Sequence, residues 1–130
     1  MVSWIRQNKT VSVWIPPVFW AAVILVFSVV PYSQDIPIEI GPFDKVGHFF
    51  GYAILAILMI RGIYYNRSFS HVRSFLFTLI LGGGYGILME LVQRFIPGRE
   101  AALDDIVANF AGIIFGIILG GLYYGRNKII

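Results

Sequence analysis

The sequence predicts an all-helical integral membrane protein, a bundle of four transmembrane helices. Of its 130 residues, 58% are hydrophobic and only 13% are charged, whereas soluble domains carry about 25% charged residues. The apolar residues fall into four runs, each with a helical length close to the roughly 30 Å thickness of the hydrocarbon layer. The length leaves room for one domain, residues 1–130, and for no separate soluble module.

The first two apolar runs are separated by a segment rich in proline. The first predicted span covers about residues 13–30, with Pro16 and Pro17 in its first turn, where a missing N–H costs little. We interpret it as an uncleaved anchor rather than a signal peptide, because no small-residue cleavage site follows. Residues 31–43 have a loop composition, and the second span is predicted at about residues 44–63.

The second half of the chain repeats this pattern of apolar run and polar loop. Residues 64–73 are predicted to form a polar loop, followed by spans at about residues 74–95 and 105–124. These runs are apolar on all sides, as helices surrounded by lipid and other helices are. Aromatic side chains near the ends of the runs are expected to anchor them at the membrane interfaces. This set comprises Trp4, Trp14, Trp20, Tyr64, Tyr65, Tyr123 and Tyr124.

The charges outside the spans predict the orientation. With four spans, one side of the membrane collects basic residues and no acid, and the other side collects Lys45, Arg94 and Arg99 with all the acids. Because cytoplasmic loops are enriched in Lys and Arg, both termini are predicted to be cytoplasmic. The basic residues form no stripe that would predict nucleic-acid binding. The first side holds Arg6, Lys9, Arg61, Arg67, Arg73, Arg126 and Lys128.

Polar residues gather at the ends of the last three spans that are predicted to face outward. Because residues three or four apart share a helix face, each of these spans presents a polar stripe. Ionisable groups at membrane depth are costly, so we treat them as candidate site residues. The predicted ligand-binding set is Asp44, Lys45, His48, Tyr52, Glu90, Gln93, Arg94, Arg99, Asp105 and Asn109.

Glycines continue two of these stripes into the membrane. Gly82 and Gly86 precede Glu90 on the third span, and Gly112, Gly116 and Gly120 follow Asn109 on the fourth. Since glycine lets membrane helices approach closely, we predict that the third and fourth spans meet along these seams. The same seams would also allow a homo-oligomer.

Two motifs carry a family resemblance. DKVGHFFGYAIL, from Asp44, and ELVQRFIPGREAALDDIVANFAGIIFG, from Glu90, resemble the VanZ-like family. The resemblance implies a bacterial plasma-membrane protein of the cell envelope. The family is named for a member that gives low-level resistance to the glycopeptide antibiotic teicoplanin, and the resemblance makes such resistance a candidate role of this chain. It implies no settled reaction, and a serine pair usual after the first span is only partly matched by Ser28 and Ser33.

Several candidate residues have an ordinary structural interpretation as well. Asp44 and Asp104 can cap helices, and Arg94 can complement a helix dipole or reach the headgroups. Glu90, about 10 Å below Pro97 at helical rise, needs a partner or a proton, and a pair with Lys45 or Arg94 would supply it. These structural and functional interpretations stay open at the level of sequence.

Three functions fit these residues. The first is an outward-facing pocket that binds an anionic headgroup or a lipid-linked envelope precursor through Lys45, Arg94 and Arg99. The second is a membrane-embedded enzyme in which Glu90, Asp105 and His48 perform acid–base or metal-assisted phosphoester or glycoside chemistry. The third is a proton-coupled transporter. We favour the first function and predict no cofactor or metal ion. Asp44 and His48, four residues apart, would suit two metal ligands, but this spacing is loose, and no nucleophile motif is present.

Overall fold

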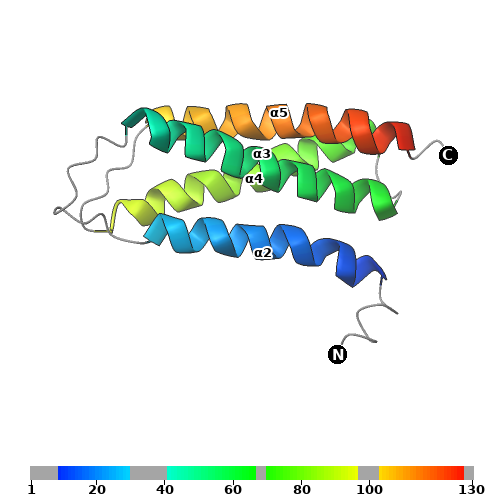
Figure 1. Cartoon of the computed structure of the whole chain (residues 1–130), viewed down its shortest axis with the longest axis horizontal. Helices are drawn as coiled ribbons and strands as arrows, with labels where there is room; N and C mark the ends of the chain where they lie inside the picture. The colour runs from blue at the N-terminus through cyan, green and yellow to red at the C-terminus, as the bar shows by residue number, and fades with distance from the viewer. Residues whose placement is uncertain (1–8, 30–40, 67–69, 97–102, 128–130) are drawn as a thin grey trace.

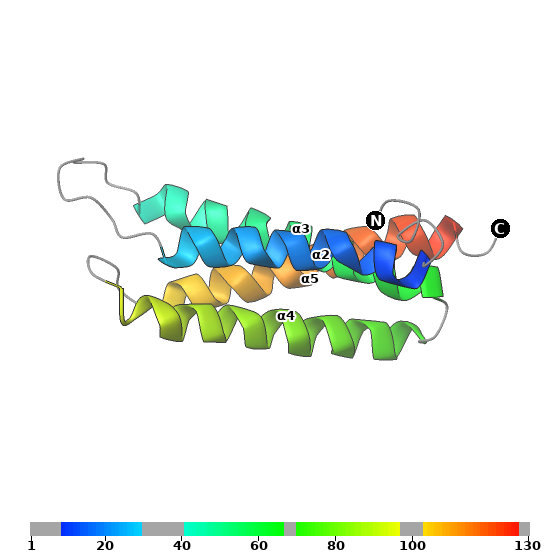
Figure 2. The same ribbon diagram turned by 90° about the horizontal axis from the view of Figure 1, so that it is seen from below.

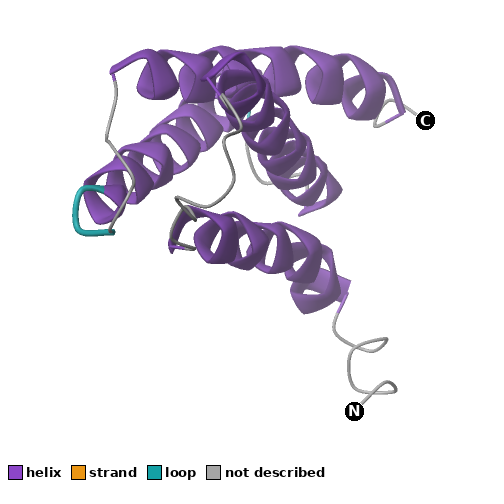
Figure 3. Ribbon diagram, turned by 60° about the vertical axis from the view of Figure 1, so that its left-hand side comes forward, coloured by secondary structure: helices purple, strands orange, loops and turns teal. Residues whose placement is uncertain are grey.

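The computed structural model describes the backbone of residues 9–29, 41–66, 70–96 and 103–127. Four long helices account for nearly all of it: α2 (Lys9–Val29), α3 (Gly41–Asn66), α4 (His71–Gln93) and α5 (Leu103–Asn127). Each contains a segment long and apolar enough to cross a membrane. The described part of the chain holds no strand (Figure 3), so the predicted all-helical membrane fold with four spans is confirmed.

The helices run side by side and alternate in direction (Figures 1 and 2). Figure 1 therefore shows the beginnings of α3 and α5 at the same end of the bundle as the ends of α2 and α4. α3 is the central helix: it packs against each of the other three, most extensively against α5. The buried apolar core accordingly combines six residues of α3 with two of α5. These are Tyr52, Leu55, Ala56, Met59, Ile60 and Tyr64, with Ile113 and Ile117.

The helices extend further than the sequence predicted. α2 begins at Lys9, so Pro16 and Pro17 lie inside it rather than in its first turn. Helix interiors in membranes tolerate proline because neighbouring groups re-satisfy the freed backbone. α3 begins at Gly41, which places the last residues of the predicted loop, including Pro42, in the first helical turn. Proline costs little there.

The predicted loop at residues 64–73 is also shorter than expected. α3 continues to Asn66 and α4 begins at His71, after Ser70. The Ser70 side chain accepts a hydrogen bond of 3.3 Å from the Arg73 amide, which caps α4 and starts it earlier than hydropathy indicates. At its other end α4 stops at Gln93, two residues before the predicted end.

The glycine seams pack differently from the prediction. Gly82 and Gly86 of α4 do face α5, where their nearest neighbours include Ile113 and Asn109. Gly112 and Gly116 of α5, however, face α3. The prediction that these α5 glycines meet the third predicted span, which is α4, was wrong. They pack against α3 instead, the helix with which α5 makes its most extensive contact.

At Gly112 the two backbones are too close for any side chain. A Cβ atom there would overlap the carbonyl oxygen of Phe49, and one at Gly116 would overlap the carbonyl oxygen of Ala53. Close approach of this kind lets membrane helices gain van der Waals contact where no hydrophobic effect drives them together. Since these glycines lie inside a single chain, an oligomer would need other surfaces.

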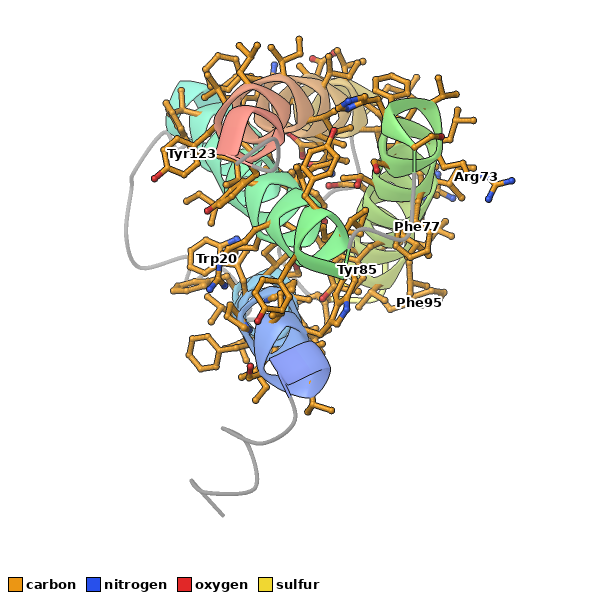
Figure 4. The ribbon with its side chains drawn as sticks, turned by 90° about the vertical axis from the view of Figure 1, so that its right-hand side faces the viewer. Trp20, Arg73, Phe77, Tyr85, Phe95 and Tyr123 are labelled. Atoms are coloured by element: carbon orange, nitrogen blue, oxygen red, sulfur yellow. The ribbon has the colours of Figure 1, made fainter. Side chains whose placement is uncertain are left out.

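α2 lies to one side of the other helices and contacts α3 and α4 (Figure 3). The indole N–H of Trp20 donates a 2.8 Å hydrogen bond to the carbonyl of Gly51, and the Tyr85 hydroxyl donates one of 2.5 Å to the carbonyl of Ala21. Both side chains lie where α2 meets its neighbours (Figure 4). Trp20, near the middle of α2, thus forms a hydrogen bond between helices and is not the interfacial anchor that was predicted.

Candidate functional site

Polar side chains from three helices meet near one end of the bundle. At this end α3 and α5 begin and α4 ends (Figure 1). We call this group the polar cluster: His48 and Tyr52 of α3, Glu90 of α4, and Asp105 and Asn109 of α5. All five lie within the apolar segments that could cross a membrane. Four are almost fully buried, with exposed fractions of 2% for Tyr52, 3% for Glu90, 6% for Asp105 and 1% for Asn109.

His48 is the centre of the polar cluster. Its Nδ1 lies 2.8 Å from Oδ1 of Asn109, a hydrogen-bond distance. The same nitrogen is 3.8 Å from Oε1 of Glu90, and Nε2 on the other side of the ring is 3.9 Å from Oδ2 of Asp105. One imidazole therefore lies between two carboxylates that come from different helices.

Helix dipoles act oppositely on the two buried carboxylates. Asp105 lies in the first turn of α5, where the dipole is positive and favours an anion. Glu90 lies in the last turn of α4, where the dipole is negative. A negative charge on Glu90 is therefore not stabilised by its own helix. It depends on groups from other helices, such as His48 of α3.

Gly86 shapes the inner wall of the polar cluster. A Cβ atom at Gly86 would lie 3.1 Å from Nδ2 of Asn109 and 3.2 Å from Cε1 of Tyr52. The side chains of Asn109 and Tyr52 therefore pack against the α4 backbone one helical turn before Glu90. The Tyr52 hydroxyl and the Asn109 Nδ2 are buried and have no hydrogen-bond partner among the described residues.

Charged residues surround the outer side of the polar cluster. Lys45 Nζ forms an ion pair of 3.0 Å with Oδ2 of Asp104, and both side chains are largely exposed, at 49% and 73%. Asp105, next in sequence to Asp104, is buried and faces His48. Arg94 is exposed at the end of α4, and Gln93 is buried there.

The structure thus brings together five of the ten predicted site residues: His48, Tyr52, Glu90, Asp105 and Asn109. Lys45 engages Asp104, so the predicted pair of Lys45 with Glu90 is not formed as a direct contact. The side chain of Asp44 and all of Arg99 lie outside the described residues. The binding and catalytic roles of these residues remain predictions.

A contact between His71 and Tyr64, at the opposite end of the bundle, was not predicted from the sequence. His71 was assigned to a loop, but it is the first residue of α4, and its Nδ1 lies 2.8 Å from the Tyr64 hydroxyl. The two rings are also in edge contact, with centroids 5.6 Å apart. No periodicity could have found this pair, because its members lie on different helices.

A shallow hollow of about 360 Å³ lies elsewhere, between α3 and α5. It is lined by apolar and aromatic side chains without a charged group: Ile57, Leu119, Gly120, Tyr123 and Tyr124. This lining holds no carboxylate, histidine or cation, so the hollow offers none of the chemistry of the polar cluster.

Comparison with known proteins identifies the family. Residues 3–124, nearly the whole chain, match the VanZ/LLP1 family. The chain belongs to this family. The resemblance carried by the two polar motifs is therefore confirmed, and the VanZ/LLP1 match extends it to all four helices.

A eukaryotic protein is among the relatives. Uncharacterized protein C11E3.10 of Schizosaccharomyces pombe is 33% identical over 97 residues, which cover 74% of this chain and 56% of that protein. The chain thus corresponds to little more than half the length of this relative. No solved structure matches the chain.

Proposed function

We propose that this VanZ/LLP1 protein binds a phosphate-bearing lipid headgroup at the end of the bundle that holds the polar cluster. The observation that supports this proposal is the convergence of buried polar side chains from three helices at one end of an apolar bundle. Lys45 and Arg94 are exposed at that end. The N-termini of α3 and α5 point the same way, and helix N-termini favour anions.

Lys45 is the side chain best suited to contact the phosphate. Its partner Asp104 is 73% exposed, and exposed ion pairs contribute only about 0–1 kcal/mol. A phosphate oxygen can therefore replace the Asp104 carboxylate at little cost. It would also accept a charge-assisted hydrogen bond.

Two kinds of lipid carry this chemistry: a glycerophospholipid such as phosphatidylglycerol, and a polyprenyl phosphate that carries an envelope precursor. A relative in a eukaryote favours recognition of a feature that many membranes share, namely the lipid phosphate, over one confined to the bacterial wall. The polyprenyl phosphate is the envelope-related alternative, and the experiment below separates the two.

Lipid-resolved mass spectrometry of the gently purified protein tests the proposal. The wild-type chain should retain phosphatidylglycerol or polyprenyl phosphate over phosphatidylcholine. Lys45→Gln should reduce this retention several-fold. Arg73→Gln is the matched control, because Arg73 is an exposed cation at the opposite end that points away from the bundle (Figure 4). Equal retention by wild type and Lys45→Gln would contradict the proposal.

The proposal includes an orientation. We place the chain in a bacterial plasma membrane with both termini in the cytoplasm, so that the polar cluster faces outward. Reporters fused after Arg67 or Lys128 should report the cytoplasm, and reporters fused after Ile38 or Ala102 should report the outside. The reverse pattern would place the polar cluster at the cytoplasmic surface.

An envelope role makes a genetic prediction. The phenotype to measure is low-level teicoplanin resistance of cells that produce the protein. Glu90→Gln and Arg99→Gln should each abolish this phenotype while the protein still accumulates in the membrane. Retained resistance in both variants would separate these residues from the function.

A second function, membrane-embedded catalysis, is favoured by one observation. His48, Glu90 and Asp105 each offer a ligand or proton-transfer atom within 4.8 Å of the others. Such a group suits acid–base hydrolysis of a phosphoester or glycoside bond. Release of phosphate from a lipid phosphate by the wild-type protein, lost in His48→Gln, would favour this second function.

The third function from the sequence, a proton-coupled transporter, has weaker support. Transporter binding sites lie near the middle of the bilayer. Glu90 lies only three residues before the end of α4, about 4.5 Å along the helix, and Asp105 lies in the first turn of α5. This position suits a ligand at the membrane surface better than one carried across.

A further inference from the structure

We propose that His48, Glu90 and Asp105 form a binding site for one divalent transition-metal ion, with zinc as the best-matched example. Each residue belongs to a different helix: α3, α4 and α5. One ligand atom from each lies within 4.8 Å of the other two. The proposal does not depend on the lipid proposal, because the ion alone can be tested.

The distances suit ligands that share an ion better than ligands that bond to each other. Nε2 of His48 lies 3.9 Å from Oδ2 of Asp105, which is too long for a direct hydrogen bond, and one ligand atom from each of the three residues lies within 4.8 Å of the other two. Two ligands each about 2.1 Å from one ion are about 3.0–4.2 Å apart, depending on the angle between them. Movements of less than about 1 Å bring all three atoms into this range.

The donor set indicates the class of ion. One imidazole nitrogen and two carboxylates suit zinc or manganese, whereas magnesium and calcium prefer oxygen donors alone. Three protein ligands leave a fourth position open, as in catalytic zinc sites. A divalent charge would also balance the two carboxylates, which is valuable where burial makes charge costly.

Asn109 orients His48 as a metal ligand needs to be oriented. With its amide oxygen accepting from Nδ1–H at 2.8 Å, the lone pair of His48 is on Nε2, the nitrogen nearer Asp105. Metal-binding histidines usually donate their other N–H to a carbonyl or carboxylate in this way. Asn109 is 1% exposed, so water does not compete for this contact.

Two buried polar groups independently point to a ligand at this position. The Tyr52 hydroxyl and Nδ2 of Asn109 lack a hydrogen-bond partner in the part of the chain that the structure describes. Nδ2 of Asn109 and the ring of Tyr52 lie against Gly86, one helical turn from Glu90. Buried polar groups are nearly always satisfied, and water bound at the open metal position could accept a hydrogen bond from Nδ2 of Asn109 and donate one to the Tyr52 hydroxyl.

Zinc titration tests the site directly. The full chain, purified in detergent and stripped with a chelator, should bind one zinc ion per chain by equilibrium dialysis. His48→Gln and Asp105→Asn should each weaken binding at least tenfold, since even outer partners of metal ligands change affinity about 10–100-fold. His71→Gln is the control: this other histidine already contacts Tyr64, so its variant should bind as wild type does.

Zinc-edge X-ray absorption of the wild-type protein provides a measurement that does not depend on the folding of a variant. The spectrum should show one imidazole nitrogen among oxygen ligands. The proposal is overturned if no zinc is retained, if the spectrum lacks imidazole, or if both variants keep wild-type affinity. A loss of binding in His71→Gln equal to that in His48→Gln would overturn it as well.

Discussion

The two histidines of this chain lie at opposite ends of the bundle and occupy very different environments. His71 begins α4, is exposed, and contacts Tyr64 across a short connection between neighbouring helices. The side chain of His48 is only 13% exposed and lies among Glu90, Asp105 and Asn109. The contact at His71 involves two consecutive helices. The environment of His48 forms only when α3, α4 and α5 are packed together.

This difference separates a local contact from a site. Solvent can replace Tyr64 as the partner of His71, because the His71 side chain is exposed. Nothing equivalent can replace the carboxylates around His48, because they are buried and a charge left without its partner there is costly. Substitutions at the polar-cluster end should therefore affect both stability and ligand binding, and those at the His71 end should affect neither strongly.

The largest effect is expected where α5 meets α3. Gly112→Ala would place a methyl group on the Phe49 carbonyl and should lower the free energy of unfolding by about 3 kcal/mol, the upper range for overpacking. Gly121→Ala is the control at the opposite end, where the nearest atom to the new Cβ is the Tyr64 hydroxyl at 3.9 Å.

Thermal unfolding in detergent, followed by circular dichroism, measures both variants. Gly121→Ala should unfold at nearly the wild-type temperature. An equal loss in the two variants would mean that the α3–α5 contact is not tighter at the polar-cluster end.

Replacing each histidine by alanine gives the next largest effect. His48→Ala removes the hydrogen-bond partner of Asn109. It also leaves Glu90 and Asp105 without the imidazole that lies between their carboxylates. We expect a loss of about 2–3 kcal/mol, typical of breaking a buried polar network. His71→Ala should cost less than about 1 kcal/mol, because water can take its place at Tyr64. Steric-trap unfolding in micelles would measure both, and equal losses would remove the distinction between the two ends.

The sequence predicted the membrane fold and half of the candidate site, and for a definite reason. Hydropathy and helical periodicity act within one helix, and they placed His48 with Tyr52 and Asp105 with Asn109 on single faces. Which helix a face meets depends on packing in three dimensions. Gly112 and Gly116 were therefore assigned to the wrong neighbour, and the pair of Tyr64 and His71 was not found.

The ends of the helices show the same limit. Hydropathy indicates where a chain can cross a membrane, whereas the helix itself continues until a cap or a turn stops it. α3 is helical for three residues before Asp44, and α4 begins at His71 because Ser70 caps it. Polar residues such as Asn66 and Arg73 thus lie in helices that extend beyond the apolar runs.

A smaller effect is expected from two glycines of α4. A Cβ atom at Gly84 meets nothing within 4 Å, so Gly84→Ala should raise the free energy of unfolding by up to about 1 kcal/mol through helix propensity. At Gly86 the same change presses on Asn109 and Tyr52 at 3.1–3.2 Å. Gly86→Ala should therefore be about 1 kcal/mol less stable than Gly84→Ala. It should also bind zinc more weakly, and identical zinc binding by the two would contradict the packing of Asn109 over α4.

The smallest effect should come from Asp104, which competes with any phosphate for Lys45. Because the pair is exposed, Asp104→Asn should change the free energy of unfolding by less than about 0.5 kcal/mol. It should nevertheless increase retention of phosphatidylglycerol or polyprenyl phosphate about twofold, since Lys45 is released. The increase should disappear in high salt, which screens exposed charges, and also in the double variant Lys45→Gln, Asp104→Asn. A gain that persists in the double variant would mean that Asp104 repels the headgroup directly, and Lys45 would then have no part in binding it.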